Sequence, residues 1–163
     1  MTKYQKDLQM IMNPILKHEE YQKLRDMGHH GITRYDHCFR VAYYTYYVTR
    51  ILHLNYREAT RAALLHDFFT DEVSSFNAIF KLRRHPMAAL NNSKKYFEIS
   101  DLEEDIIKTH MFPVTFTPPK YLESWIVDFI DDISAIYERG FTIKKEIKTT
   151  AMFFFVFLFK YFH

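Results

Sequence analysis

A chain of 163 residues is long enough to close one apolar core without a second domain. Hydrophobic residues make up 48% of it and charged residues of both signs 26%, which excludes intrinsic disorder of the whole chain. The net charge is +2 and there is no long basic block. The chain therefore lacks the clustered positive charge that binding to duplex nucleic acid requires.

Few residues in the chain favour turns, since there are only 3 glycines and 5 prolines. This scarcity favours helices joined by short connections, so we expect an all-α protein. The single cysteine, Cys38, has no partner for an internal disulfide, and the first ten residues lack the apolar run of a signal peptide. A cytoplasmic, reducing environment and one domain over residues 1–163 are therefore expected.

The first 27 residues carry apolar side chains at helical spacing, but Asn13-Pro14 interrupts them with a capping residue and a helix-starting proline. Two short helices are predicted there. Gly28 and Gly31 then supply a turn. A longer helix, ending near Leu52, is predicted by a pattern at steps of four and three that lies on one face: His37, Val41, Tyr44, Val48 and Ile51.

The segment of residues 56–69 places Ala59, Ala62, Ala63 and His66 on one face. These small side chains let another helix approach closely, so a buried central helix is predicted. No clear periodicity follows over residues 70–84. Pro86 then stands where a helix can begin, which would put His85 at the helix entrance.

Ser100 and Glu103 form a capping box, and with the neighbouring acidic residues they predict a helix over residues 101–110. His110 falls on the face that this helix should bury. After a loop with three prolines, a last helix is predicted to close at Gly140 as its C-cap, with Asp131 on the face of Val127.

Residues 151–163 form an almost purely apolar run, which would be costly to expose to water. With about ten apolar residues before Lys160, the run is shorter than the ~20 that cross a bilayer. We expect it to dock on the core or on a partner subunit, with a homodimer buried through this segment, and membrane association is the alternative.

Six buried-face or helix-end residues have side chains suited to metal binding. An unpaired imidazole or carboxylate is costly to bury, and together these groups are the ligands that divalent transition metals prefer. The six are His37, His66, Asp67, His85, His110 and Asp131. Three further histidines, His18, His53 and His163, show no partner pattern and are expected at the surface.

The order of these six residues resembles the HD-domain superfamily of metal-dependent phosphohydrolases. TRYDHCFRVAYYTYYV is similar to the first ligand helix of that family, RAALLHDFF to its His-Asp helix and IVDFIDDISAIYE to its terminal ligand helix. HPMAAL and IIKTHMFP resemble the two histidine segments of its two-metal members. The resemblance covers residues 28–138.

The resemblance implies a compact bundle of about seven helices with the metal site between central helices. It implies that His37, His66, Asp67 and Asp131 hold one ion, that His85 and His110 bind a second, and that Asp67 bridges the two. His66 and Asp67 would then be the catalytic pair. Their reaction would be hydrolysis of a phosphate ester or anhydride, in a nucleotide or small phosphorylated metabolite, by a metal-activated water. Fe, Mn, Co, Ni and Zn are not distinguished by such ligands.

Phosphate also needs cationic or hydrogen-bonding side chains beside the metal. Arg34, Lys108, Lys120 and His30 are the candidates, each weighed against an ordinary surface or loop residue. Asp128 and Asp132 compete with Asp131 for the last ligand position, because a small error in helix register would exchange them.

Two other functions remain open from the sequence. Some two-iron members of the same superfamily carry out oxygen-dependent cleavage, and a non-catalytic binding module would keep the fold alone. MFP follows His110 in place of the GYP of cyclic dinucleotide hydrolases, which argues against that substrate. The tyrosines of residues 43–47 are attributed to packing rather than to nucleobase stacking.

Overall fold

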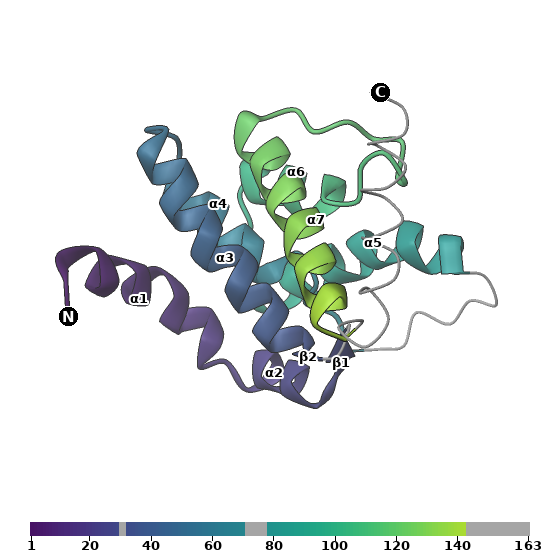
Figure 1. Ribbon diagram of the computed structural model, residues 1–163, viewed down its shortest axis with the longest axis horizontal. Helices are drawn as coiled ribbons and strands as arrows, with labels where there is room; N and C mark the ends of the chain where they lie inside the picture. Colours follow the sequence, from purple (N-terminus) through teal and green to yellow (C-terminus); the bar gives the residue numbers. More distant parts are fainter. Residues whose placement is uncertain (30–31, 71–77, 143–163) are drawn as a thin grey trace, which may run out of the picture.

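The computed structural model describes residues 1–29, 32–70 and 78–142 (Figure 1). Seven α-helices account for most of these residues, which confirms the predicted all-α fold. In chain order the elements are α1 Lys3–Leu16, α2 Glu19–Gln22, the 3₁₀ helix η1 Lys23–Asp26, β1 Gly28–His29, β2 Ile32–Thr33, α3 Arg34–Ile51, α4 Tyr56–Leu65, α5 Ala78–Tyr96, α6 Asp101–Thr109 and α7 Leu122–Thr142. The two short strands pair antiparallel, Gly28 with Thr33 and His29 with Ile32.

Helix α4 is the centre of the fold. It packs against α1, α3, α5, α6 and α7, and its small residues Ala59, Ala62 and Ala63 are fully buried. Small side chains let neighbouring backbones approach, which is why one helix of ten residues can contact five others. The prediction of a buried central helix is confirmed.

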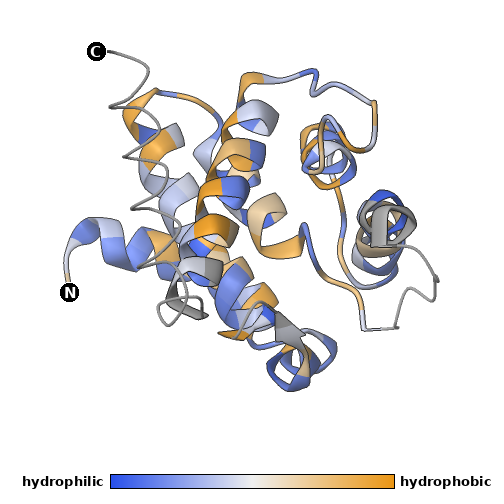
Figure 2. Cartoon of the chain, turned by 45° about the vertical axis from the view of Figure 1, so that its right-hand side comes forward, coloured by the Kyte–Doolittle hydropathy of each residue, from blue (hydrophilic) through white to orange (hydrophobic). Residues whose placement is uncertain are grey.

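Helices α3 and α7 are long neighbours on one side of α4 (Figure 1). Hydrophobic and hydrophilic residues share the same helices (Figure 2). This is the pattern of amphipathic helices that bury one side against a core. The core residues of α3 are spaced accordingly, with Cys38, Val41, Ala42 and Tyr46 fully buried.

The predicted break at Asn13-Pro14 is wrong, because α1 continues through Pro14 to Leu16. Proline removes one intrahelical hydrogen bond, that to the carbonyl of Met10. Met10 and Pro14 are both exposed, so water can hydrate that carbonyl. The chain breaks instead at His18, whose Nδ1 accepts from the backbone N–H of Glu20 and caps α2.

The expectation of a plain surface position for His18 is also wrong. Its imidazole is half-buried, with its ring centroid 5.2 Å from that of Tyr96 and 5.0 Å from that of Phe97. His53 is exposed, as expected. His163 lies outside the described residues.

The predicted start of a helix at Pro86 is wrong as well. Helix α5 begins at Ala78, so Pro86 lies inside it and His85 sits within the helix instead of at its entrance. Proline favours the first turn of a helix but is also tolerated further inside when packing compensates for the lost hydrogen bond, and Pro86 is buried.

The start of α6 follows the prediction closely. Ser100 Oγ accepts from the backbone N–H of Glu103 at 3.2 Å, and the backbone N–H of Ser100 donates to Glu103 Oε2 at 3.0 Å. The predicted C-cap at Gly140 is wrong, because α7 continues to Thr142. A glycine ends a helix by adopting a left-handed conformation, and Gly140 does not adopt one.

Among the residues that the structure describes, no helix combines the length and hydropathy needed to cross a membrane. The predicted docking of residues 151–163 falls outside the described residues.

Candidate metal centre

Five segments, far apart in the sequence, contribute the six predicted ligand residues. His37 lies on α3, His66 and Asp67 directly follow α4, and His85 lies within α5. His110 caps the end of α6, and Asp131 lies in the middle of α7. All six side chains are largely buried, with His85 the most exposed. The fold brings together every one of them.

Three overlapping groups of these residues have the geometry to hold a metal ion. Within each group, one ligand atom per residue lies within 4.8 Å of the others. The groups are His37, His66 and Asp67; His66, His110 and Asp131; and Asp67, His85 and His110. Because the groups share members, the six side chains form one continuous cluster.

Asp131 joins two imidazoles on one side of the cluster. Its Oδ1 lies 2.8 Å from His37 Nε2 and 3.6 Å from His66 Nε2. Burial alone would raise the pKa of Asp131, but the two histidines outweigh burial and hold that pKa well below its ordinary value. Asp131 is therefore a carboxylate near neutral pH.

Asp67 plays the matching part on the other side. Its Oδ1 lies 3.4 Å from His85 Nε2 and 3.8 Å from His110 Nε2, and these two nitrogens are 2.9 Å apart. Two imidazole nitrogens and a carboxylate oxygen thus face a common point. Asp67 also belongs to the group with His37 and His66, so its carboxylate is shared between the two sides.

Backbone carbonyls set the tautomers of two of the histidines. His66 Nδ1–H donates to Ala63 O at 2.7 Å, and His110 Nδ1–H donates to Ile107 O at 2.8 Å. Each Nε2 is then left as an acceptor inside the cluster. His66 Nε2 is buried and has no hydrogen-bond partner among the described residues. A buried acceptor without a donor is costly, and a cation at this point would satisfy it, so the residues fit a metal ion.

Glu138 is a contact of the cluster that the sequence did not predict. His37 Nδ1–H donates to Glu138 Oε2 at 2.9 Å, and Arg40 Nη1 donates to Glu138 Oε1. Carboxylates commonly hold metal-binding histidines in this way, from behind the ring. The signal was present, because Glu138 follows Asp131 by seven residues, two helix turns along the same face.

Burial and neighbouring charges shift the pKa values of three histidines in the cluster. Burial would lower the pKa of His37, but hydrogen bonds to Asp131 and Glu138 raise it to about 10. The pKa of His66 is also raised, because the field of Asp131 outweighs burial. Burial and the neighbouring His66 and His85 lower the pKa of His110 to about 3. His37 therefore holds a proton near neutral pH, whereas His110 stays neutral.

The competing aspartates of α7 are separated by the geometry. Asp131 reaches the cluster, whereas neither Asp128 nor Asp132 belongs to any of the three metal-type groups found among the described residues. Asp132 is exposed, and Asp128 is buried. Burial and the nearby Asp132 and Asp131 raise the pKa of Asp128 to about 7.

The predicted phosphate-binding residues are not gathered as the ligands are. The Arg34 guanidinium stacks 3.8 Å from the Phe69 ring centroid, and its Nη1 donates to Phe69 O at 2.5 Å. The Phe69 ring lies 5.6 Å from that of His85, so Arg34 is near the cluster. Lys108 and Lys120 are exposed, and neither side chain contacts the six residues in the described part of the chain. His30 lies outside the described residues.

Fold and site together define an all-α protein with a buried cluster of histidines and aspartates arranged as a metal centre. The family model for the HD domain matches residues 34–136, more than half of the chain and all six cluster residues. The chain therefore belongs to the HD-domain family, which confirms the predicted resemblance. Comparisons with curated proteins and with solved structures gave no match.

Proposed function

We propose that this protein is a metal-dependent phosphohydrolase that cleaves a phosphate ester or anhydride of a nucleotide or small phosphorylated metabolite. We further propose that it works as a single cytoplasmic domain with two divalent transition-metal ions. One observation carries the proposal: six imidazoles and carboxylates from five segments converge in overlapping groups of metal-type geometry. Membership of the HD-domain family supports the same reading.

The ligands divide between two positions. His37, His66, Asp67 and Asp131 would hold one cation, and His85, His110 and Asp67 the other. When bound, the cations supply Lewis-acid activation of a water and of the phosphoryl oxygens. Asp67 orients both positions because its carboxylate belongs to both sides of the cluster. Burial of the histidines keeps bulk water from competing for the ligand atoms.

The four phosphate-binding candidates remain part of the proposal. Arg34 is the best supported, because its guanidinium lies beside Phe69, two residues after Asp67. Lys108, Lys120 and His30 are proposed on the sequence pattern alone. A guanidinium next to a metal centre matches the geometry of a phosphate, which accepts two parallel hydrogen bonds.

The test is metal analysis of the purified protein, followed by a phosphate-release screen. The screen covers nucleotides and small phosphorylated metabolites with added manganese, cobalt, nickel or iron. Bound metal together with phosphate release supports the proposal. Metal near zero and no release under any condition would leave a non-catalytic module. A mixed-valence iron signal with oxygen-dependent cleavage would move the assignment to that chemistry.

Substitution ties the activity to the cluster. Asp67→Ala should abolish phosphate release and lower the metal content, because Asp67 belongs to both sides of the cluster. His53→Asn is the matched control, since His53 is exposed at a φ of 57°, a conformation that asparagine accepts. His18 is a poorer control because it caps α2. Equal activity in the parent and in Asp67→Ala would refute the site.

A further inference from the structure

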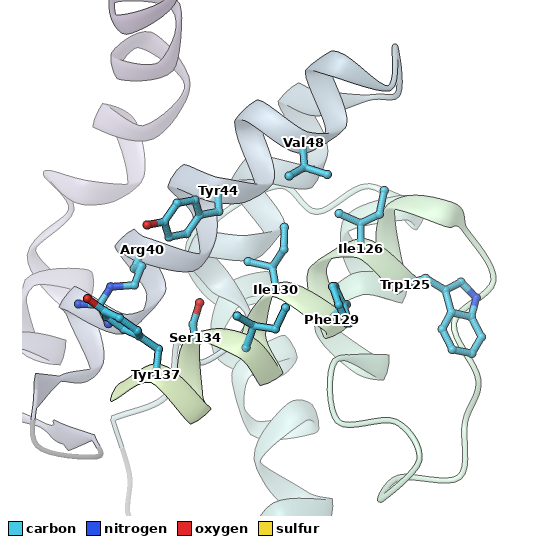
Figure 3. A pocket seen from close by; sticks show the side chains of 10 residues that line it. Arg40, Tyr44, Val48, Trp125, Ile126, Phe129, Ile130, Ser134 and Tyr137 are labelled. Atoms are coloured by element: carbon cyan, nitrogen blue, oxygen red, sulfur yellow. The ribbon is translucent and has the colours of Figure 1, made fainter. Parts of the chain in front are cut away.

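A large apolar groove runs between α3 and α7 on the outside of the molecule. It has a volume of about 640 Å³, with walls that include Tyr44 and Val48 from α3 and Phe129 and Ile133 from α7. Figure 3 shows Tyr44 and Val48 on α3 beside Ile130 and Phe129 on α7. Arg40 and Tyr137 lie at one end, and Trp125 lies at the other (Figure 3).

The α7 side of this groove is exposed to an unusual degree. Phe129 is 65% exposed and Ile133 is 50% exposed, one helix turn apart. Leu122, Trp125 and Ile136 continue the same exposed series along α7. A contiguous apolar surface of this kind marks a place where something docks, because leaving it in water is costly.

The same chain carries a second apolar stretch. Residues 151–159 read AMFFFVFLF and follow residues 143–150, which read IKKEIKTT, and both stretches lie outside the described part of the structure. Helix α7 ends at Thr142, five residues after Tyr137. That end is therefore about 8 Å along the helix axis from the groove.

Lengths also agree. Residues 143–150 reach at most about 28 Å when extended, which is more than enough to turn the chain back to the groove. From Tyr137 to Trp125 the groove follows twelve residues of helix, about 18 Å. Thirteen residues, 151–163, would measure about 20 Å as a helix, so they match the groove end to end.

We propose that residues 151–163 occupy the α3–α7 groove of their own chain. A short tether raises their effective concentration at the groove to the millimolar range, which an untethered second copy does not reach. Docking of residues 151–163 in the groove also removes both the groove and this apolar segment from water. A dimer formed through the groove alone would leave the segment exposed. The inference is independent of the proposed hydrolase activity.

Trp125, the single tryptophan of the chain, reports directly on the groove. In the full chain, the double variant Phe155→Asp with Leu158→Asp should shift Trp125 emission to longer wavelength and increase its quenching by acrylamide. Thr149→Asp with Thr150→Asp adds the same charge in the tether and should leave both readings unchanged. Circular dichroism checks that helix content is retained in each variant. Unchanged emission in the first variant overturns the proposal.

Cross-linking identifies the occupant. A short bismaleimide should join Ile133→Cys to Phe155→Cys within one chain, at a yield independent of protein concentration. Cys38 is fully buried and does not compete. Pairing Phe155→Cys with Ile51→Cys, an exposed apolar position outside the groove, should give no intramolecular product.

Two outcomes would overturn the assignment. Covalent dimers from the Ile133 and Phe155 pair, increasing with concentration, would give the groove to a second copy. Binding of the full chain to phosphatidylcholine vesicles, with Trp125 still accessible to acrylamide, would assign the segment to a lipid surface.

Discussion

Both ring nitrogens of His37 are engaged by carboxylates. Nε2 lies 2.8 Å from Asp131 Oδ1, and Nδ1 lies 2.9 Å from Glu138 Oε2. One carboxylate lies on the metal side and the other holds the ring from behind, with Arg40 fixing the second. The ring orientation is thus set before any cation binds, which lowers the cost of assembling the site.

This arrangement would make Glu138 a positioning residue for the proposed metal site. Glu138→Gln removes the negative charge behind His37 and weakens the contact with Arg40. We expect metal affinity to fall by about 10- to 100-fold with helix content unchanged. Competition titration with a chromophoric chelator measures the affinity. Glu104→Gln, which removes an exposed ion pair with Lys94, should not change it. Equal affinities in the two variants would contradict the role of Glu138.

Asp128 gives a pH prediction at the same scale. Its folded pKa, about 7, is raised above the ordinary 3.8, so the folded state binds the proton more tightly. The stability from this protonation is fully present below pH ~4 and is lost as pH rises through ~7. Asp128→Asn should therefore be more stable than the parent at pH 8, by roughly 1–2 kcal/mol after solvent screening.

Urea unfolding of the metal-free protein at pH 4.5 and pH 8 provides the measurement for Asp128. The difference between the variant and the parent should shrink toward the lower pH, where the parent carboxyl is already neutral. Asp132→Asn provides a comparison, because Asp132 is exposed, although burial of its carboxyl and the nearby Asp131 also raise its pKa. A difference that does not change with pH would show that Asp128 does not titrate in this range.

Among the elements, α4 matters most to the site, because the His66-Asp67 turn follows it directly. The position of that turn depends on how closely α4 packs against its neighbours. Alanines at the contacts leave no side chain that can move aside to admit a larger one. Packing of α4 therefore sets the position of two residues that each belong to two of the three metal-type groups.

Ala62→Leu should lower the free energy of unfolding by about 1–3 kcal/mol, because the added carbons have no space in this core. It should also weaken metal binding by shifting the turn after α4. Ala88→Leu on the half-buried side of α5 is the matched substitution and should change both quantities little. Urea denaturation and metal titration measure the two effects. A fully stable Ala62→Leu variant would mean that α4 packs less closely than the structure shows.

For the whole molecule, the cluster adds a shared point of contact between helices that already pack against one another. Contributions come from α3, α5, α6, α7 and the turn after α4. A cation bound by all of them is present only in the folded state, so binding energy becomes folding energy. The metal should therefore stabilise the protein globally, not only the site.

At a free metal concentration 100 times the Kd, binding to one site adds about 2.7 kcal/mol to folding stability. For a chain of this size that corresponds to a Tm increase of about 5–10 °C. Calorimetry with and without a chelator tests the value. The effect should vanish in Asp67→Ala and persist in His53→Asn. A chelator that leaves the parent Tm unchanged would argue against a bound structural cation.

The sequence by itself determined the helical class, most of the helices and the candidate cluster residues, with Asp131 still in competition with Asp128 and Asp132. Periodicity placed the central helix, and the Ser100–Glu103 box placed the start of α6. These features depend on neighbours within one or two turns, which a sequence displays directly. Pro14, Pro86 and Gly140 misled for the same reason, since each is a local signal that the fold tolerates inside a helix.

The tertiary structure alone decided which groups meet. It selected Asp131 over Asp128, and it brought Glu138 to His37 across 101 positions of the chain. It also left an apolar groove that is lined in part by Tyr137, the residue before Glu138. Contacts of this kind depend on the angle and separation of packed helices, which arise from the whole core and are written in no single segment.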